Sequence, residues 1–516
     1  MIPPILHQSW MTANVPEALA AFAQKWRDLH PGWHYRLWTD QDLRDLVQRT
    51  YPSLLELFDG YPKPIMRVDL ARCLILKSQG GVYADLDAEP LRNLDELRAE
   101  DRPILFEEPA SHVENEFVQV RGFAREVVSN ALMLSPPGHP FWDRAVDMMK
   151  RCRGATNPLD ATGPFLLTAA VPTSPPDERP RVRPAYQLSP MDKYGQPTPP
   201  PAGAHEPPLV QHHWHGSWWK NDPAQPIRLE VAPAQTESPP RYRVWPWRRR
   251  PVPIRAPAGD QALIAIPVRN AATTLEALFQ HLFALTHPVE KRTLAFIEGD
   301  STDHSYALLE DFVRQHRAAF RDIHLLRHHQ RAPNYTHRWE PQHQRERRSG
   351  IARIRNRLLK RALGREDWVL WLDADIIQFP PTLIDDLRAV GAPVVHPNCV
   401  QTAGGPSFDL NAWIQERTVD REQMQPYMVD DLYQPPVGHN RLYLSDLRYH
   451  DHIPLHSVGG TCLLVSADVH RAGLHFPIRP EAGLIETEAF AARVRAHGCP
   501  IIGLPNYEVR HNRRAG

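Results

Sequence analysis

The stretch Trp368-Val369-Leu370-Trp371-Leu372-Asp373-Ala374-Asp375-Ile376 decides the fold of the second half of this chain. Its five apolar residues in a row predict a strand that is buried on both faces. Two carboxylates, Asp373 and Asp375, follow at i, i+2, and an extended chain places them on one side. Ligands bind at the carboxyl ends of parallel strands, where paired carboxylates suit Mg²⁺ or Mn²⁺ and the phosphates of a nucleotide sugar. The alternative is a strand whose closing aspartates cap the next helix.

Composition bounds the organisation of the chain. Its 516 residues are too many for one ordinary core, which predicts two or more domains. Lys+Arg and Asp+Glu both number 60, so no electrostatic argument favours nucleic acid or an anionic membrane as the main partner. The five cysteines are scattered and include no C-x-x-C pair, which argues against a disulfide framework or a zinc site.

The start of the chain and its hydropathy bear on location. The run Met1-Ile2-Pro3-Pro4-Ile5-Leu6-His7 enters a strand directly, without the basic and apolar regions of a signal peptide. No run of about 18 apolar residues occurs, so no transmembrane segment is expected. We therefore expect a cytoplasmic protein, and a Golgi-type lumenal location only if an anchor has been removed from this sequence.

Strand-like and helical segments alternate within residues 1–222, which predicts an α/β domain with a mostly parallel sheet. A helix is expected over 17–29 and an amphipathic helix over 65–78. Residues 172–208 are rich in proline and are predicted to form a long surface loop.

A second alternating pattern occupies residues 259–516 and includes an expected helix over 349–363. Between the two patterns, residues 223–258 are rich in proline and arginine and are predicted to be a linker. The arginine run at 248–250 could instead be a phosphate-binding patch.

Charged residues cluster near the end of the predicted helix in the first domain. Asp69 and Arg72 are spaced i, i+3 and share a face. Gly80-Gly81 ends the helix, and a short strand then delivers Asp85 and Asp87, again at i, i+2. Together these groups can bind sugar hydroxyls, a diphosphate and a metal ion. The alternative for Asp69 and Arg72 is an ordinary salt bridge on a helix.

This motif, Met66 to Asp87, resembles glycosyltransferase family 32, which includes yeast initiating α-1,6-mannosyltransferases and sphingolipid mannosyltransferases. The resemblance implies that Asp69, Arg72 and Tyr83 contact the donor, that Asp85 binds its ribose and sugar, and that Asp87 ligates a metal. Further matching motifs supply donor-binding residues and one metal ligand: Trp10, which would stack on the base, Asn130, Ser217, Trp218 and the ligand His212. A His-rich tract can also bind metal by itself, and the family motif leaves His213 and His215 unassigned.

The second domain carries its own set of polar motifs around Asp373 and Asp375. Arg353 and Arg357 are spaced i, i+4 on a predicted helix and could meet an anion, although exposed helix arginines are ordinarily only solvated. Asp300 follows a strand in a turn that is typical of a nucleotide contact. Glu486 and Glu488 are either site carboxylates or the acidic start of a helix.

These motifs resemble glycosyltransferase family 62, the subunits of yeast mannan polymerase complexes, over about residues 261–511. The resemblance implies that Asp373 and Asp375 hold metal and diphosphate, that His511 is a further metal ligand, and that Asp300, Arg353 and Asn398 bind the donor. Glu486 and Glu488 would lie on the acceptor or sugar side. Where the family has Asp-Gly-Val-Gly-Gly, this chain has His456-Ser457-Val458-Gly459-Gly460. We also expect no counterpart of the family's N-terminal membrane anchor in this sequence.

Taken together, the resemblances imply two GT-A-type domains in tandem and a bifunctional, retaining glycosyltransferase that depends on Mn²⁺ or Mg²⁺. GDP-mannose is the expected donor, although a UDP-sugar stays open for the first domain. The expected partners are a glycan acceptor on an oligosaccharide, glycolipid or glycoprotein, and a homo-oligomer or a complex with other glycosyltransferases, with no nucleic acid. The alternatives are that one domain only binds or scaffolds glycans, or that the chain is a sugar nucleotidyltransferase. The latter should carry a Gly-rich basic loop, which is absent after Leu6 and Ile266.

Overall fold

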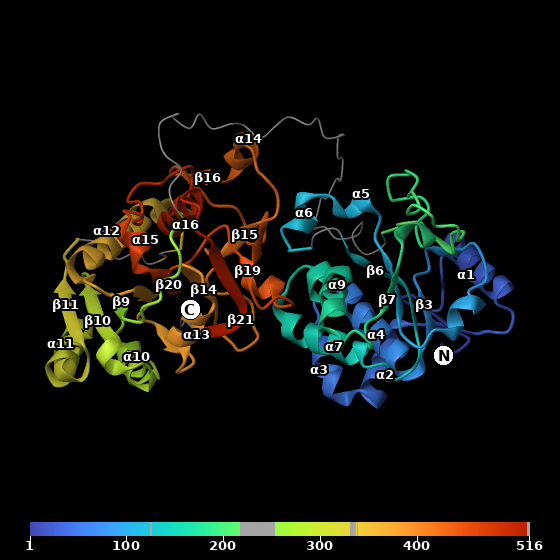
Figure 1. Ribbon diagram of the computed structural model, residues 1–516, viewed down its shortest axis with the longest axis horizontal. Helices are drawn as coiled ribbons and strands as arrows, with labels where there is room; N and C mark the ends of the chain where they lie inside the picture. Colours follow the sequence, from blue (N-terminus) through green and yellow to red (C-terminus); the bar gives the residue numbers. More distant parts are fainter. Residues whose placement is uncertain (124–125, 217–252, 331–336, 338, 513–516) are drawn as a thin grey trace. The chain divides into compact units, whose positions relative to one another are not determined.

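The computed structural model of the protein describes residues 1–123, 126–216, 253–330, 337 and 339–512. The chain divides into two compact units, Met1–Arg249 and Arg250–Gly516 (Figure 1). This division falls inside the predicted linker, of which residues 223–252 lie outside the described part. Among the described residues, no helix is both long and apolar enough to cross a lipid bilayer.

The first unit is built on a mixed sheet. Its strands lie in the order β2 (His34–Trp38), β1 (Ile5–Ser9), β3 (Gly81–Ala84), β6 (Val128–Ser135), β5 (Ile104–Glu107) and β7 (Arg181–Arg183). Strands β2, β1 and β3 are parallel, and β6 runs antiparallel to β3 and β5. A separate antiparallel pair joins β4 (Ala88–Pro90) to β8 (Val210–His212).

The helices of the first unit are α1 (Glu17–Leu29), α2 (Asp40–Thr50), α3 (Leu55–Gly60), α4 (Pro64–Gln79), α5 (Ala110–Val113), α6 (Glu116–Gln119), α7 (Phe141–Arg151), α8 (Pro158–Ala161) and α9 (Pro164–Thr173). Helix α1 has the bounds that were predicted. Helix α4 was predicted to be amphipathic, which is wrong, because it is buried from Leu70 to Leu76 without a break. The predicted loop 172–208 contains the edge strand β7, which pairs in parallel with β5.

A two-glycine turn joins α4 to β3 and fixes the strand beside β1. Gly80 and Gly81 have φ angles of 65° and 92°, which favour glycine. A Cβ atom on Gly80 would lie 2.7 Å from the nitrogen of Pro137, and one on Gly81 would lie 2.5 Å from the carbonyl oxygen of Ile5. No larger residue fits this turn without displacing backbone.

The second unit has a larger mixed sheet. Its main strands lie in the order β11 (Asp322–Arg327), β10 (Arg292–Glu298), β9 (Ala262–Val268), β12 (Trp368–Leu372), β20 (Cys462–Ser466), β14 (Val394–Val400), β21 (Ile501–His511) and β13 (Ile376–Gln378). Strands β11, β10, β9 and β12 are parallel, whereas β20 runs antiparallel to β12 and β14. The smaller strands are β15 (Trp413–Gln415), β16 (Met428–Val429), β17 (Leu432–Tyr433), β18 (Arg441–Tyr443) and β19 (Ile453–Pro454).

Helices cover both faces of this sheet. Helices α10 (Ala272–Ala284), α11 (Ser305–His316) and α13 (Leu383–Ala389) lie on one face, and α12 (Pro341–Ala362) and α16 (Glu486–Ala496) on the other (Figure 1). The short helices are α14 (Arg421–Met424) and α15 (Ala467–Arg471). Helix α12 begins at Pro341, two turns before the predicted start. The prediction missed these turns because residues 342–348 are all polar and show no apolar periodicity.

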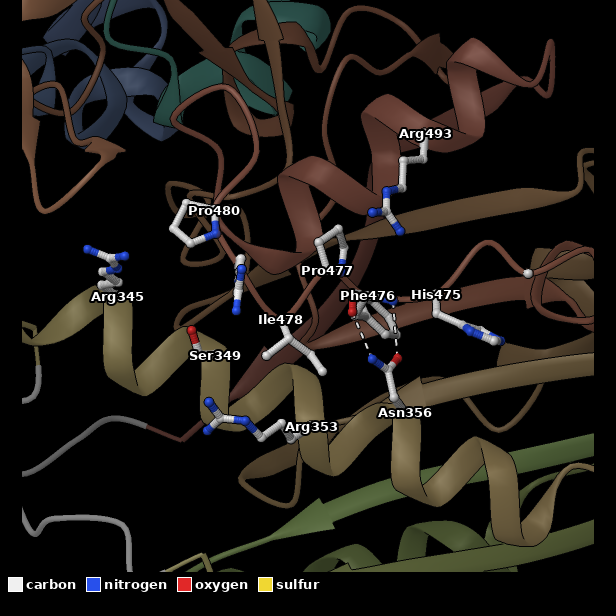
Figure 2. A pocket seen from close by; sticks show the side chains of 12 residues that line it. Arg345, Ser349, Arg353, Asn356, His475, Phe476, Pro477, Ile478, Pro480 and Arg493 are labelled. Carbon is white, nitrogen blue, oxygen red and sulfur yellow. Dashed lines mark hydrogen bonds between the residues drawn. The ribbon is translucent and has the colours of Figure 1, made fainter. Parts of the chain in front are cut away.

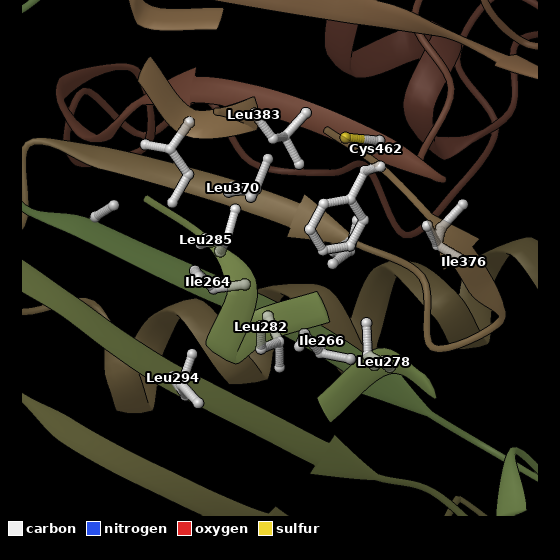
Figure 3. Packing of buried hydrophobic residues seen from close by; sticks show 14 of the residues in the cluster. Ile264, Ile266, Leu278, Leu282, Leu285, Leu294, Leu370, Ile376, Leu383 and Cys462 are labelled. Carbon is white, nitrogen blue, oxygen red and sulfur yellow. The ribbon is translucent and has the colours of Figure 1, made fainter. Parts of the chain in front are cut away.

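The core of the second unit surrounds β12. All five residues of Trp368–Leu372 are buried, which confirms the predicted strand. Leu278 and Leu282 of α10 pack against the β9 side chains Ile264 and Ile266, with Leu370 beside them (Figure 3). Each such side chain contributes about 1.5–3 kcal/mol by leaving water. The prediction of two α/β domains with mostly parallel strands is confirmed.

Candidate active sites

The first candidate site lies where β3 ends. One ligand atom each from Asp85, Asp87 and His212 come within 4.8 Å of one another. His212 is the last residue of β8 and pairs in register with Ala88, which directly follows the second aspartate. Its Nε2 lies 3.3 Å from Oδ1 of Asp87. Strand pairing therefore brings together three groups that the sequence places far apart.

The two aspartates of this site differ in their electrostatics. Burial raises the pKa of Asp85 to about 6, against the opposing charge of Arg72. Burial also disfavours ionised Asp87, but the hydrogen bond and charge of His212 outweigh it and lower the pKa of Asp87 to about 2. The Nδ1 atom of His212 is buried without a hydrogen-bond partner. Two carboxylates and an imidazole are a donor set that fits Mn²⁺.

Arg72 is the buried cation behind this motif. Its Nη1 lies 3.3 Å from Oδ1 of Asp85 and donates to the carbonyl of Asn130 at 2.6 Å. Its Nη2 lies 3.3 Å from Oδ1 of Asp69, so the predicted i, i+3 pair exists. The guanidinium carbon lies 4.8 Å from the centre of the Tyr83 ring.

Asp69, Asn130 and Tyr83 support Arg72 in this structure. Both carboxylate oxygens of Asp69 accept hydrogen bonds, from Nδ2 of Asn130 and Oγ1 of Thr162, each at 2.9 Å. Asp69 and Tyr83 are 3% and 1% exposed, so neither offers surface for the predicted donor contact. Asp69 and Tyr83 are therefore placed to orient the Arg72 guanidinium group.

The remaining predicted residues of the first site are Trp10, Ser217 and Trp218. Trp10 is half-buried and packs with Leu19 and Ala23 against Leu86, the middle residue of the D-x-D motif. Its predicted stacking on a base stays a prediction. Ser217 and Trp218 lie outside the described residues.

The second candidate site lies where β12 ends. His511 is the last residue of β21 and pairs with Ile376, which directly follows Asp375. Its Nε2 lies 2.9 Å from Oδ1 of Asp375. Burial lowers the pKa of His511, but the bond to Asp375 outweighs it and raises that pKa above its ordinary value. Within the described chain, however, only the first site brings three ligand atoms within 4.8 Å.

The buried cation of the second site is Arg355. Its Nη2 lies 3.7 Å from Oδ1 of Asp373 and donates to the carbonyl of Gly460 at 3.2 Å. Burial raises the pKa of Asp373 to about 6, while Arg355 opposes that shift. A Cβ atom on Gly460 would lie 1.9 Å from Nη2 of Arg355, so any side chain at this position would displace the guanidinium group.

The arginine beside Asp373 is thus Arg355, which was not among the predicted residues, and the predicted donor contact of Arg353 stays a prediction. Arg353 is exposed and lies about 200° around α12 from Arg355, so it points away from Asp373. A signal for Arg355 exists in the sequence, since it falls on the buried stripe formed by Ala352, Leu359 and Ala362.

Glu486 and Glu488 lie in the first turn of α16, and both are 3% exposed. Oε1 of Glu486 lies 3.3 Å from Nη1 of Arg355, whereas its Oε2 is buried with no hydrogen-bond partner. Glu488 accepts from Nε1 of Trp413 at 2.9 Å and from the backbone nitrogen of Ile485 at 3.2 Å. Glu486 therefore contacts the buried arginine of the second candidate site, while Glu488 caps the helix, and the predicted acceptor-side or sugar-side role of both stays a prediction.

Asp409 was not predicted to lie at the site. Its Oδ2 accepts from the hydroxyl of Thr461 at 2.7 Å, and the carbonyl of Thr461 in turn accepts from the backbone nitrogen of Asp373 at 2.9 Å. Burial opposes its ionisation, but the neighbouring His396, 3.8 Å away, and hydrogen bonds from Thr461 hold the pKa of Asp409 below its usual range. A Cβ atom on Gly459 would lie 1.8 Å from Oδ2 of Asp409. The pair Gly459-Gly460 is thus the sequence signal for both Asp409 and Arg355.

The remaining predicted donor contacts have different surroundings. Asp300 follows β10 with a φ of 57° and accepts from the backbone nitrogen of Gln330 at 2.9 Å. Asn398 is 0% exposed, donates to the carbonyl of Pro505 at 3.0 Å and accepts from Ser407 at 2.8 Å. The side chain of Asn398 in β14 therefore bonds to β21 and to the loop that carries Ser407, and its predicted donor contact stays a prediction.

The two sites repeat one set of contacts. In each site, the helix before the D-x-D strand supplies an arginine that contacts the first aspartate of the motif. The same arginine lies near the aromatic ring two residues before that aspartate, which is Tyr83 in the first site and Trp371 in the second. The same arginine donates to a carbonyl, and the next residue's carbonyl accepts from the backbone nitrogen of that aspartate. The residue after each histidine, His213 or Asn512, donates to the carbonyl of the second aspartate at 2.9 Å.

Comparisons with known proteins agree with this two-part organisation. The chain matches the family model described as Anp1 over residues 254–480 and the model described as glycosyltransferase sugar-binding region containing DXD motif over residues 16–103. Both resemblances seen in the sequence are therefore confirmed.

Among curated proteins, the mannan polymerase complex subunit mnn9 of Schizosaccharomyces pombe is 36% identical over 33% of this chain and 53% of its own length. Its Candida albicans counterpart MNN9 is 32% identical over 49% of this chain and 74% of that protein. Mannosyl phosphorylinositol ceramide synthase SUR1 of Saccharomyces cerevisiae is 37% identical over 29% of this chain and 35% of that protein. The chain thus spans about half or less of the length of two of these relatives.

Proposed function

Since the chain belongs to the Anp1 family and carries a DXD-containing sugar-binding region before it, we propose that it is a glycosyltransferase with two active sites. The observation that carries the proposal is the repeated set of contacts around Asp85-Leu86-Asp87 and Asp373-Ala374-Asp375. A motif that only caps a helix has no need of a buried arginine and a cross-strand histidine, and both units have them.

We propose that both sites transfer mannose from GDP-mannose, with retention of configuration. The names of the relatives support mannosyl transfer, since they include mannan polymerase subunits and a mannosyl phosphorylinositol ceramide synthase. An oligosaccharide, glycolipid or glycoprotein would be the acceptor. The mannan polymerase relatives are complex subunits by name, which supports assembly of this chain with other glycosyltransferases.

A divalent cation fits both donor sets, and the imidazole in each favours Mn²⁺ over Mg²⁺. Asp85, Asp87 and His212 would hold it in the first site, and Asp373, Asp375 and His511 in the second. When bound, such an ion supplies Lewis-acid neutralisation of the charge on a departing diphosphate.

The side chains of the protein prepare the sites for that charge. Arg72 and Arg355 are each buried beside the first aspartate of a motif, where a fixed positive charge acts more strongly than in water. Hydrogen bonds and ion pairs to Asp69 and Glu486 hold these guanidinium groups in place. Neither site needs a separate catalytic base, because in a retaining front-face transfer the leaving phosphate can accept the proton of the acceptor.

The function is tested by nucleotide release from the full chain. GDP-mannose, UDP-glucose and UDP-N-acetylglucosamine are each incubated with the protein and an α-mannoside acceptor, with Mn²⁺ or with a chelator. We expect GDP release and a product larger by one or more hexoses, dependent on Mn²⁺. Turnover of UDP-sugars alone would refute the proposed donor, and turnover unaffected by the chelator would refute the metal dependence.

A further inference from the structure

A cavity of about 760 Å³ lies beside α12 on a different stripe from the one that carries Arg355 (Figure 2). Helix α12 lines it with Arg345, Ser349 and Arg353, about one residue per turn. The segment 475–480 and Arg493 of α16 form the other walls.

The walls of this cavity are tied together. The side-chain amide of Asn356 donates to the carbonyl of Phe476 at 2.8 Å and accepts from its backbone nitrogen at 3.1 Å, as the dashed lines in Figure 2 show. Phe476 itself is 2% exposed and packs on Trp371 of β12 with ring centres 5.3 Å apart. The cavity is therefore shaped before any ligand enters.

The charge of the lining is one-sided. Four arginines line the cavity, and none of the described lining residues is acidic. Arg345 pairs with Asp431 at 3.0 Å and Arg493 pairs with Glu481. Within the described chain, Arg353 and Arg479 have no carboxylate partner. Two guanidinium groups from two different elements are therefore available to an anion.

We propose that this cavity binds a phosphoryl group that is part of a larger molecule, through Arg353, Arg479 and the hydroxyl of Ser349. Guanidinium groups match phosphate oxygens in pairs, and a serine hydroxyl can donate to a further oxygen. The volume is in the range of small-molecule sites and exceeds that of a bare phosphate, so it leaves room for the group that carries it. Pro477 and the exposed Ile478 give that group an apolar wall. No residue of either D-x-D motif lines the cavity, which shares Arg345, Ser349 and Arg479 with a smaller pocket that Glu486 lines. Its binding can be measured without turnover.

Binding is tested by calorimetry on the full chain without Mn²⁺, with inorganic phosphate, myo-inositol 1-phosphate and the dicarboxylate malonate as probes. We expect the inositol phosphate to bind more tightly than phosphate, and malonate to bind weakly. Arg353→Gln and Arg479→Gln should each weaken binding about tenfold, the loss of one charged hydrogen-bonding partner. Arg357→Gln is the matched control, because Arg357 is exposed on the same helix and does not line the cavity.

A second arm distinguishes a soluble phosphate ester from a lipid headgroup. Phosphatidylcholine vesicles with and without phosphatidylinositol are sedimented with wild type and with the same variants. Sedimentation that requires phosphatidylinositol, Arg353 and Arg479 identifies a lipid headgroup, and binding of the soluble ester alone identifies a soluble ligand. The proposal is overturned if no phosphate probe binds, if malonate binds as tightly, or if Arg357→Gln weakens binding as much as the other two substitutions.

Discussion

At the scale of single residues, Arg355 is the side chain on which the second site depends. It contacts Asp373, Glu486 and the carbonyl of Gly460 from a buried position. Replacing it with glutamine removes the fixed charge beside Asp373. We expect transfer at the second site to fall by about 10²-fold or more, measured as the rate of GDP release in an Asp87→Ala background.

The control for this substitution is Arg357→Gln, an exposed arginine of the same helix. Because Arg355→Gln also leaves Glu486 with one cationic partner fewer, its thermal unfolding is recorded alongside. A folded Arg355→Gln protein with unchanged GDP release would exclude this role for Arg355.

Gly460 gives a second test of the same contact. In Gly460→Ala the new methyl group would occupy the place of the Arg355 guanidinium, whose Nη2 lies 1.9 Å from the Cβ position. Arg355 must move, so we expect a loss of second-site transfer similar to that of Arg355→Gln. Gly364→Ala is the control, since the nearest atom to its Cβ position is a flexible carboxylate oxygen 3.4 Å away. Equal rates of second-site transfer in Gly460→Ala and Gly364→Ala would show that transfer does not depend on the position of the Arg355 guanidinium group.

His212 and His213 are adjacent but have different partners. His212 lies with Asp85 and Asp87, whereas Nε2 of His213 lies 2.8 Å from Glu89. We expect His212→Ala to weaken Mn²⁺ binding at the first site about tenfold or more, and His213→Ala to leave it nearly unchanged. Titration of Mn²⁺ in an Asp375→Ala background measures this by electron paramagnetic resonance. An equal loss in both variants would contradict the assignment of His212.

The D-x-D pairs and their histidines could be predicted from sequence because each stands in a recognisable motif. Arg355 and Asp409 were harder to predict, because only their burial distinguishes them from the many exposed arginines and aspartates of the chain. Asn398 shows the reverse case. Its place in a matching motif predicted a donor contact, whereas in the structure its side-chain amide bonds to Pro505 of β21 and to Ser407.

At the scale of elements, the buried strand β12 carries the fold of the second unit. Leu370 is 0% exposed and packs in the core between β9, α10 and α13. We expect Leu370→Ala to lower the free energy of unfolding of that unit by about 2–5 kcal/mol, through lost burial and the cavity that remains. Leu308→Ala on α11 is the control, because Leu308 is 38% exposed.

Urea denaturation followed by tryptophan fluorescence measures both substitutions, with the transitions of the two units fitted separately. A Leu370→Ala loss as small as that of Leu308→Ala would mean that β12 is less tightly packed than described.

Elements with strong apolar periodicity could be predicted from sequence, and those defined by distant partners could not. Helix α4 and strand β12 were placed correctly, although α4 is buried on more sides than an amphipathic helix would be. Strand β7 was missed because its three residues, Arg181–Arg183, become a strand only by pairing with β5. The same limit applies to β8 and β21, whose pairing delivers His212 and His511.

At the scale of the whole molecule, the central feature is the repetition of one site in two units of different size. The shared contacts include backbone hydrogen bonds as well as side-chain contacts. The repetition therefore extends to the pairing of the strand that carries the histidine with the segment after the D-x-D motif. The sequence predicted two domains from its two alternating patterns. It did not predict that a buried arginine would recur beside each first aspartate, because Arg72 and Arg355 stand at different sequence separations from Asp85 and Asp373.

The measurement that tests the two-site account most directly is product analysis of Asp87→Ala and Asp375→Ala in the full chain. Exposed aspartates of the same units supply the controls Asp147→Ala and Asp311→Ala. Products formed from GDP-mannose and Mn²⁺ are separated by mass, and their linkages are determined. The account predicts that each site variant loses a different sugar addition while both controls make the wild-type products. Identical products from Asp87→Ala, Asp375→Ala and wild type would contradict it.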